Sequence, residues 1–255
     1  MFRKLRILIL LLILATVGLG AWRANSRLTA WEHTIHVGIY PIAADDSPAT
    51  QSFIRGLDAE SLSDIAEWMQ AESQRYGKPV LRPISLNVAP PLAEQPPLPP
   101  EHASALDAII WSLKLRWWAS RHDAIGGPKP HVRLFVLFHD PDRMPRLPHS
   151  TGLSKGQVGI VHAFASRLQR KQNSVVLTHE LLHTFGATDK YDPATLLPVY
   201  PAGYAEPERN PRWPQRFAEI MGGRTPIDER NAEIPNSLDD TLVGSATAIE
   251  IGLLR

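Results

Sequence analysis

The chain has 255 residues, of which 44% are hydrophobic and 21% charged, a composition that excludes a disordered protein and can supply a sizeable core. Lys and Arg total 27 and Asp and Glu total 26, so the chain lacks the basic excess of a nucleic-acid-binding protein. The absence of cysteine excludes disulfides, thiolate zinc sites, iron–sulfur clusters and cysteine nucleophiles. Any metal ion must therefore be held by His, Asp or Glu.

The N-terminal segment, residues 1–28, has five basic residues and no acidic one, which leaves a net charge of −4 on the rest. Its run from Ile7 to Trp22 is uncharged, and a basic flank before an apolar run is typical of a signal peptide or a signal-anchor. At about 1.5 Å per residue the run reaches roughly 24 Å, short of a roughly 30 Å hydrocarbon core, so cleavage and anchoring both stay open. We expect the remainder outside the cytoplasm, either periplasmic or at the cell surface, and either secreted or held to the membrane by this segment.

The first half of the remaining chain predicts two strands and a helix. Thr34 to Ile42 alternates as a strand does, Ser61 caps an amphipathic helix that runs to about Tyr76, and Leu81 to Val88 forms a second strand. Six prolines between Pro90 and Pro100 then predict an extended connector.

A strong helix follows from Ala103 to about His122. Trp111, Leu115 and Trp118 recur at helical spacing and are expected in the core. Apolar runs at His131 to Phe138 and Gln157 to Phe164 predict two more strands. The alternation of strands and helices indicates a mixed sheet with helices packed on it.

The chemistry is concentrated in a helix predicted from about Ser174 to Phe185. It contains His179-Glu180-Leu181-Leu182-His183, and a spacing of four residues places both imidazoles on one helical face, where they can reach one metal ion. Only on the order of 0.02 such five-residue matches are expected by chance from this composition.

The residues after this motif extend it to H-E-x-x-H-x-x-G-x-x-D, because Gly186 and Asp189 follow at fixed distances. Requiring both lowers the expected number of chance matches to on the order of 10⁻⁴. Gly186 can adopt a positive φ and end the helix, and the chain can then turn back to bring the Asp189 carboxylate to the same ion.

This motif resembles that of the metzincin zinc peptidases, whose third ligand is usually His. The form with Asp, followed two residues later by Tyr, is similar to the snapalysin family, and Asp189 and Tyr191 stand in that order. The runs at 186–192 and 200–207 resemble a distinct bacterial-type family of metallopeptidases.

The resemblance implies an α+β, zincin or metzincin-like fold, with a mixed twisted sheet, an active-site helix, a Met-turn and a C-terminal helix. The turn matches Glu219 to Gly223 around Met221, and the helix matches Ser237 to Leu254. The edge strand that pairs with an extended substrate matches Val158 to Phe164. We expect one domain at 29–255, with an N-terminal subdomain at 29–188 and a C-terminal subdomain at 189–255.

Each residue of the motif then has an expected role. His179, His183 and Asp189 hold zinc (Zn2+), and Glu180 takes a proton from the zinc-bound water and delivers it to the leaving amine. Tyr191 is either a hydroxyl donor to the oxyanion or a packed loop residue.

Other candidate ligands stay open at this point. The third ligand could instead be a different carboxylate, namely Asp192, Glu206 or Glu219. Three further histidines are expected to be structural or exposed, namely His139, His149 and His162.

The sequence therefore predicts an exported or membrane-anchored zinc metallopeptidase that cleaves polypeptides and has no nucleic-acid partner. The alternative from another class is a catalytically silent zincin-fold module for binding or assembly in the cell envelope. A zinc hydrolase acting on a non-peptide amide is a third possibility.

Overall fold

The computed structural model describes residues 6–7, 11–12, 18–20, 23, 26–100, 104–154 and 156–254. The signal peptide or signal-anchor predicted at residues 1–28 thus lies mostly outside the described residues. Within the described part of the chain, no helix is both long and apolar enough to cross a bilayer. Around the end of this segment the chain is tied to the core, because Leu28 is buried and Trp31 Nε1 donates a 2.7 Å hydrogen bond to the Ile251 carbonyl.

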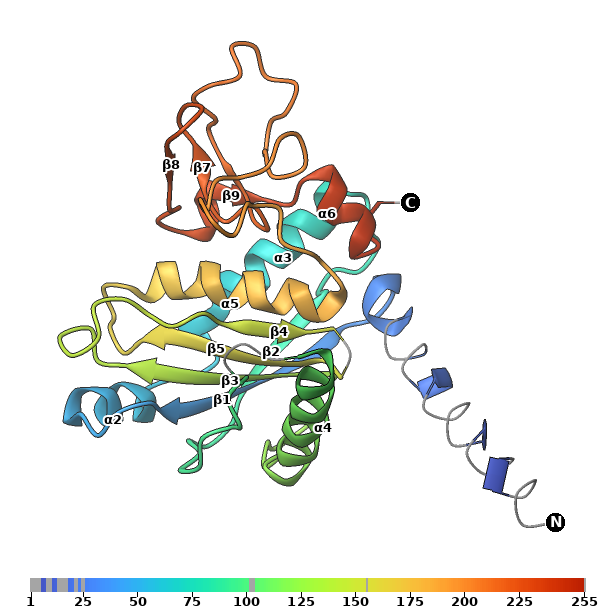
Figure 1. Ribbon diagram of the computed structural model, residues 1–255, viewed down its shortest axis with the longest axis vertical. Helices are drawn as coiled ribbons and strands as arrows, with labels where there is room; N and C mark the ends of the chain where they lie inside the picture. Colours follow the sequence, from blue (N-terminus) through green and yellow to red (C-terminus); the bar gives the residue numbers. More distant parts are fainter. Residues whose placement is uncertain are drawn as a thin grey trace.

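A five-stranded mixed sheet lies at the centre of the molecule (Figure 1). Its strands are β1 (Ile35–Ala43), β2 (Ile84–Val88), β3 (Val132–His139), β4 (Thr151–Leu153) and β5 (Val158–Phe164). They are ordered β2-β1-β3-β5-β4; all neighbours are parallel except β4, which pairs antiparallel with β5. The inner strands are almost continuously apolar because helices cover both of their faces.

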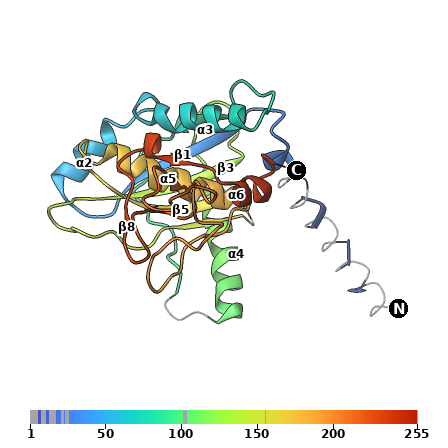
Figure 2. The ribbon, with the colours of Figure 1, turned by 90° about the horizontal axis from the view of Figure 1, so that it is seen from above.

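The helices are divided between the two faces of this sheet. They are α2 (Pro48–Arg55), α3 (Ser63–Arg75), α4 (Ala105–Arg121), α5 (Arg170–Phe185) and α6 (Ser245–Glu250), with 3-10 turns η1 (Glu60–Leu62) and η2 (Leu238–Asp240). In Figures 1 and 2, α3 and α5 lie on one side of the sheet and α4 on the other.

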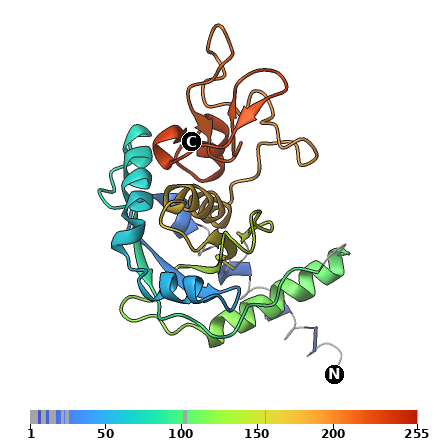
Figure 3. The same cartoon turned by 90° about the vertical axis from the view of Figure 1, so that its left-hand side faces the viewer.

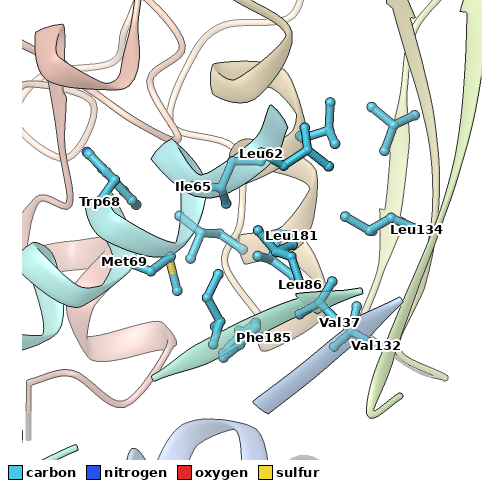
Figure 4. Packing of buried hydrophobic residues seen from close by; sticks show 14 of the residues in the cluster. Val37, Leu62, Ile65, Trp68, Met69, Leu86, Val132, Leu134, Leu181 and Phe185 are labelled. Atoms are coloured by element: carbon cyan, nitrogen blue, oxygen red, sulfur yellow. The ribbon is translucent and has the colours of Figure 1, made fainter. Parts of the chain in front are cut away.

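Each face of the sheet has its own hydrophobic core. On the α5 side, Val37 and Leu134 from the sheet meet Ile65 of α3 and Leu181 of α5 (Figure 4). On the α4 side, the buried residues are those predicted from helical spacing together with sheet aromatics: Tyr40, Trp111, Leu115, Trp118 and Phe135. The core role expected for the two tryptophans and Leu115 is thus confirmed.

The C-terminal part has little regular structure and lies over α5 (Figure 3). Its short strands are β6 (Ala218–Glu219), β7 (Thr225–Pro226), β8 (Ala232–Glu233) and β9 (Thr241–Leu242). The first core cluster includes residues from both sides of position 188, such as Leu181 and Ile220.

The four predicted strands and the helix of residues 105–121 are present, but three sequence-based expectations are wrong. Ser61 does not cap a helix: it lies in the 3-10 turn η1, and its backbone N–H donates to Asp58 Oδ1. The helix expected from Ser237 to Leu254 is broken, so that only α6 is α-helical. The expected edge strand β5 lies inside the sheet, because the short strand β4, three residues long, adds outside it.

Candidate metal centre

The last turns of α5 place two imidazoles side by side. His179 and His183 are one turn apart, and their ring centroids lie 4.8 Å from each other. The helix ends at Gly186, whose φ of 109° is left-handed and whose N–H donates to the His183 carbonyl at 3.0 Å. This glycine cap turns the chain back on itself, as predicted, and brings Asp189 over the same helical face.

Three ligand-type atoms meet at this place. His179 Nε2 lies 3.1 Å from His183 Nε2, and Asp189 Oδ1 lies 3.1 Å from the first and 3.2 Å from the second. The three atoms form a nearly equilateral triangle. Both histidines are mostly buried, but 43% of the Asp189 side chain is exposed, so the centre opens to solvent on that side.

Backbone carbonyls orient both imidazoles. His179 Nδ1 lies 2.9 Å from the Ile220 carbonyl oxygen, and His183 Nδ1 lies 2.9 Å from the Ala187 carbonyl oxygen. A carbonyl can only accept, so each Nδ1 carries a proton and each Nε2 is directed inward, where it can offer a lone pair to a cation when the ring is neutral. Two ring nitrogens and a carboxylate oxygen therefore converge, an arrangement that a shared cation stabilises.

The charges of this cluster shift its pKa values strongly. Burial opposes ionisation of Asp189, yet hydrogen bonds from His179 and His183 hold its pKa well below the usual range. Burial also opposes protonation of His179, but Asp189 and the charge of Glu180 together raise the pKa of that imidazole. The centre thus favours the state in which a positive charge lies between the three groups.

Glu180 lies beside the triangle and has a different environment. Its carboxylate is within 4.8 Å of the ligand nitrogens of His179 and His183. The side chain is buried, which raises its pKa, and it interacts with the backbone N–H of Gly152 in β4. Among the described residues, its Oε2 has no hydrogen-bond partner. A buried, unpartnered carboxylate oxygen next to three converging ligands is suited to accept a proton there.

Tyr191 also lies at the centre. Its ring centroid is 6.4 Å from that of His179. Burial, followed by the charges of Asp189 and Glu180, raises the pKa of its phenol to about 12, so the hydroxyl keeps its proton and remains a donor. Tyr191 therefore lies at the centre, with its hydroxyl beside Asp189.

The alternative carboxylates are engaged in other interactions. Glu219 is completely buried and accepts hydrogen bonds from the Gly222 and Gly244 amides and the Thr247 hydroxyl. The two others bind partners of their own: Glu206 pairs with Arg216, and Asp192 caps the turn at 194–195. Of the carboxylates considered, only Asp189 contacts both histidines.

The predicted methionine turn borders the centre. Gly222 and Gly223 donate their N–H groups to the Glu219 carbonyl at 2.9 and 3.0 Å, and Met221 is completely buried. The preceding Ile220 supplies the carbonyl that orients His179. Met221 is therefore part of the hydrophobic core, while its neighbour Ile220 holds the His179 ring in place.

Sequence reasoning missed three supports of the centre: the Ile220 carbonyl, Gly152, and the ion pair between Lys190 and Glu250. A Cβ at Gly152 would lie 2.4 Å from the Glu180 carbonyl oxygen, so β4 touches the backbone of α5. Lys190 Nζ lies 2.7 Å from Glu250 Oε2 and ties the Asp189 loop to α6. These contacts span 28 to 60 residues along the chain, and no local pattern indicates them.

The other three histidines occupy structural or exposed positions, as expected. His139 Nε2 and His162 Nδ1 lie 2.8 Å apart and are buried, and His149 is exposed. No protein-family model matches the chain, and no curated protein sequence matches it either.

Proposed function

We propose that the protein is a zinc-dependent peptidase with a metzincin-like, zincin-type fold, exported from the cytoplasm and either secreted or anchored by its N-terminal segment. One observation carries the proposal: the triangle of His179, His183 and Asp189, with the unpartnered Oε2 of Glu180 beside it. A structural zinc site would have a fourth protein ligand, whereas a catalytic one uses three and leaves one position for substrate or water.

The donor set fits zinc by chemistry and by spacing. Zinc takes neutral imidazole nitrogens and carboxylate oxygens at about 2.0–2.1 Å, which makes adjacent ligands of a tetrahedron about 3.3 Å apart. The observed separations of 3.1 to 3.2 Å are close to that value. Both imidazoles have the Nδ1–H to carbonyl contact that commonly fixes a ligating histidine.

Bound zinc would supply a Lewis acid that makes water more acidic and polarises a carbonyl group. Glu180 Oε2 then accepts a proton from the attacking water and later donates it to the nitrogen of the leaving amine. The Tyr191 hydroxyl donates to the oxygen that gains negative charge during attack. The water's oxygen ends in the new carboxyl group, so atoms and charge balance.

An extended polypeptide fits the edge of the sheet next to this centre. β4 is the outermost strand, and its Gly152 touches the carbonyl of Glu180. A substrate strand added to the free edge of β4 would run past the carboxylate, with main-chain hydrogen bonds providing sequence-tolerant affinity. This role falls to Thr151–Leu153 rather than to β5.

The first test combines metal analysis with proteolysis. We expect the purified full chain to contain one zinc ion and to cleave denatured casein, with loss of cleavage in a chelator. Glu180→Gln should retain zinc and lose about 10²- to 10⁴-fold in kcat, the usual contribution of a general base. The matched control is Glu67→Gln, which changes an exposed helical carboxylate on α3.

A folded, zinc-loaded protein that cleaves neither casein nor a peptide library would contradict peptidase activity and support the silent envelope module. Cleavage that persists in Glu180→Gln would contradict the role given to that residue. Cleavage of a non-peptide amide alone would move the substrate class and leave the zinc chemistry intact.

A further inference from the structure

Helix α4 is apolar on two opposite faces, although only one of them is covered. Trp111, Leu115 and Trp118 face the sheet and are buried. The other stripe consists of exposed apolar residues at helical spacing: Leu106 (64% exposed), Ile109 (57%), Ile110 (42%), Leu113 (56%) and Trp117 (63%). A contiguous apolar stripe of this kind on a soluble surface marks a site of interaction.

Cations border this stripe on both sides. At 100° per residue, Arg116 falls along one border, and Lys114 and Arg121 fall along the other; all three are exposed. The Arg121 guanidinium lies 5.1 Å from the centroid of the Trp117 ring. The helix has a single acidic residue, Asp107, and its carboxylate accepts hydrogen bonds from the backbone N–H and the hydroxyl of Ser104 in the capping box.

The same side of the molecule has further positive charge where the N-terminal segment joins the domain. Arg23 and Arg27 line one pocket together with His131 and Gln157. A Cβ at the adjoining Gly156 would lie 3.0 Å from the Arg116 side chain, so Arg116 runs along that backbone. The cations of α4 and those of the N-terminal segment therefore lie near one corner.

We propose that the exposed face of α4 docks on an anionic membrane surface, with its apolar stripe in the headgroup region. An apolar stripe with a Trp, bordered by Lys and Arg and with its single acidic neighbour Asp107 held in the capping box, has the charge and shape complementarity of an interfacial helix to anionic lipid. A protein partner of ordinary composition would need acidic groups at both borders. The proposal does not depend on the peptidase activity, because α4 and the metal centre lie on opposite faces of the sheet (Figure 1).

The absence of cysteine makes a direct test possible, because any introduced thiol is the only one. Leu113→Cys is labelled in the full chain with a polarity-sensitive fluorophore. Leu168→Cys is the matched control, a leucine that is 98% exposed in the loop before α5. Both proteins are mixed with vesicles of phosphatidylcholine and phosphatidylglycerol in equal parts, and with phosphatidylcholine alone. Circular dichroism checks that both labelled chains keep the fold.

With the anionic vesicles, the label at 113 should shift to the blue, brighten several-fold and be quenched by brominated acyl chains, while the label at 168 stays in water. Lys114→Gln and Arg121→Gln should each reduce the inserted fraction roughly fivefold. An N-terminal segment that acts only as a tether leaves both labels in water on vesicle-bound protein, and this overturns the proposal.

Two other results also overturn it. Full chain that fails to sediment with anionic vesicles has no such docking face. Protection of the 113 label that needs no vesicles and rises with protein concentration would assign the face to a second copy of the chain.

Discussion

Two buried glutamates near the candidate metal centre show how partners decide what a residue does. Burial raises the pKa of both Glu180 and Glu219. Glu219 accepts three hydrogen bonds that hold the turn of residues 219–223 against the start of α6, whereas the Oε2 of Glu180 has no partner among the described residues. The Glu219 carboxylate therefore has a structural role, and the Glu180 carboxylate is left able to exchange a proton.

Asp189 and Glu219 are both candidates for the third ligand by sequence alone, but their different partners predict opposite effects of substitution. Asp189→Ala should lower metal affinity by more than about 100-fold, because even the loss of a residue that only supports a ligand can cost that much. The unfolding free energy should change little. Glu219→Ala should keep a full zinc equivalent and lose about 3 kcal/mol, because three buried donors lose their acceptor. Zinc content and urea unfolding measure both effects.

Full zinc occupancy in Asp189→Ala would refute the assignment of the third ligand. If Glu219→Ala does not fold, Glu219→Gln keeps one acceptor oxygen and should retain zinc with a smaller loss of stability.

The buried histidine pair on the α4 side predicts a pH-dependent stability. Burial and the neighbouring His139 lower the pKa of His162 to about 4, whereas the unfolded chain has the ordinary value of about 6.5. Between these values the unfolded state binds a proton that the folded state does not. The unfolding free energy should therefore decrease as the pH is lowered from about 6.5 to about 4, by at most about 1.4 kcal/mol per pH unit.

Urea unfolding of chelator-treated protein between about pH 7 and 4 measures this effect. His162→Gln should flatten the dependence, and His149→Gln, at an exposed position, should leave it unchanged. A slope that is equal in His162→Gln and the natural chain would show that other groups cause the acid sensitivity.

The residues that the sequence could predict at the site are those encoded within one short segment. The two histidines, Glu180 and Asp189 lie within eleven positions, and their geometry follows from helical spacing and a glycine cap. The Ile220 carbonyl and the Gly152 amide reach the centre only through the folding of distant segments, so the sequence could not indicate them.

At the scale of elements, long apolar runs were predictable and short paired segments were not. β1, β3 and β5 are recognisable because each is a mostly apolar segment of seven to nine residues. β4 has three residues, including a glycine, and it is a strand only because β5 pairs with it. The order of strands, and with it the identity of the edge, follows from that pairing.

The close contact between β4 and α5 predicts that adding one methyl group at Gly152 lowers both stability and activity. In Gly152→Ala the new Cβ would meet the Glu180 carbonyl oxygen at 2.4 Å and the His183 Cβ at 2.7 Å, so β4 must move away from the helix. We expect a loss of about 1–3 kcal/mol in stability and roughly 100-fold in kcat/KM for casein.

Gly126→Ala is the matched control, because a Cβ there would meet nothing within 4 Å. Equal stability and activity of the two variants would mean that the edge strand does not need its close approach to α5.

At the scale of the whole molecule, the C-terminal helix α6 is fastened to the loop that carries Asp189. The Glu250 carboxylate accepts from the Thr188 amide at 2.9 Å, from the Thr188 hydroxyl at 2.7 Å and from Lys190 Nζ at 2.7 Å. Asp189 lies between these two residues. Helix α6 thus holds in place a proposed ligand that lies more than fifty residues earlier in the chain.

Removing this fastening should weaken both folding and metal binding. In Glu250→Ala the mostly buried Lys190 ammonium loses its counter-ion, and we expect a loss of about 2 kcal/mol with about 10-fold weaker zinc affinity. The exposed Glu229→Ala is the control. Adding Lys190→Met to Glu250→Ala should restore part of the stability, because the uncompensated charge is gone. No recovery in the double variant would contradict the electrostatic origin.

If α4 docks on a membrane, its placement on the opposite face of the sheet from α5 fixes the distance between the lipid and the candidate metal centre (Figure 2). Each helix packs about 10 Å from the sheet, so the candidate metal centre on α5 would stand about 20 Å above the layer in which α4 lies. An extended chain advances about 3.3 Å per residue. A membrane-bound substrate would then need about six extended residues between the lipid and its scissile bond to reach that centre. The thickness of the sheet and its two helix layers would thus set the minimum distance of cleavage from the membrane.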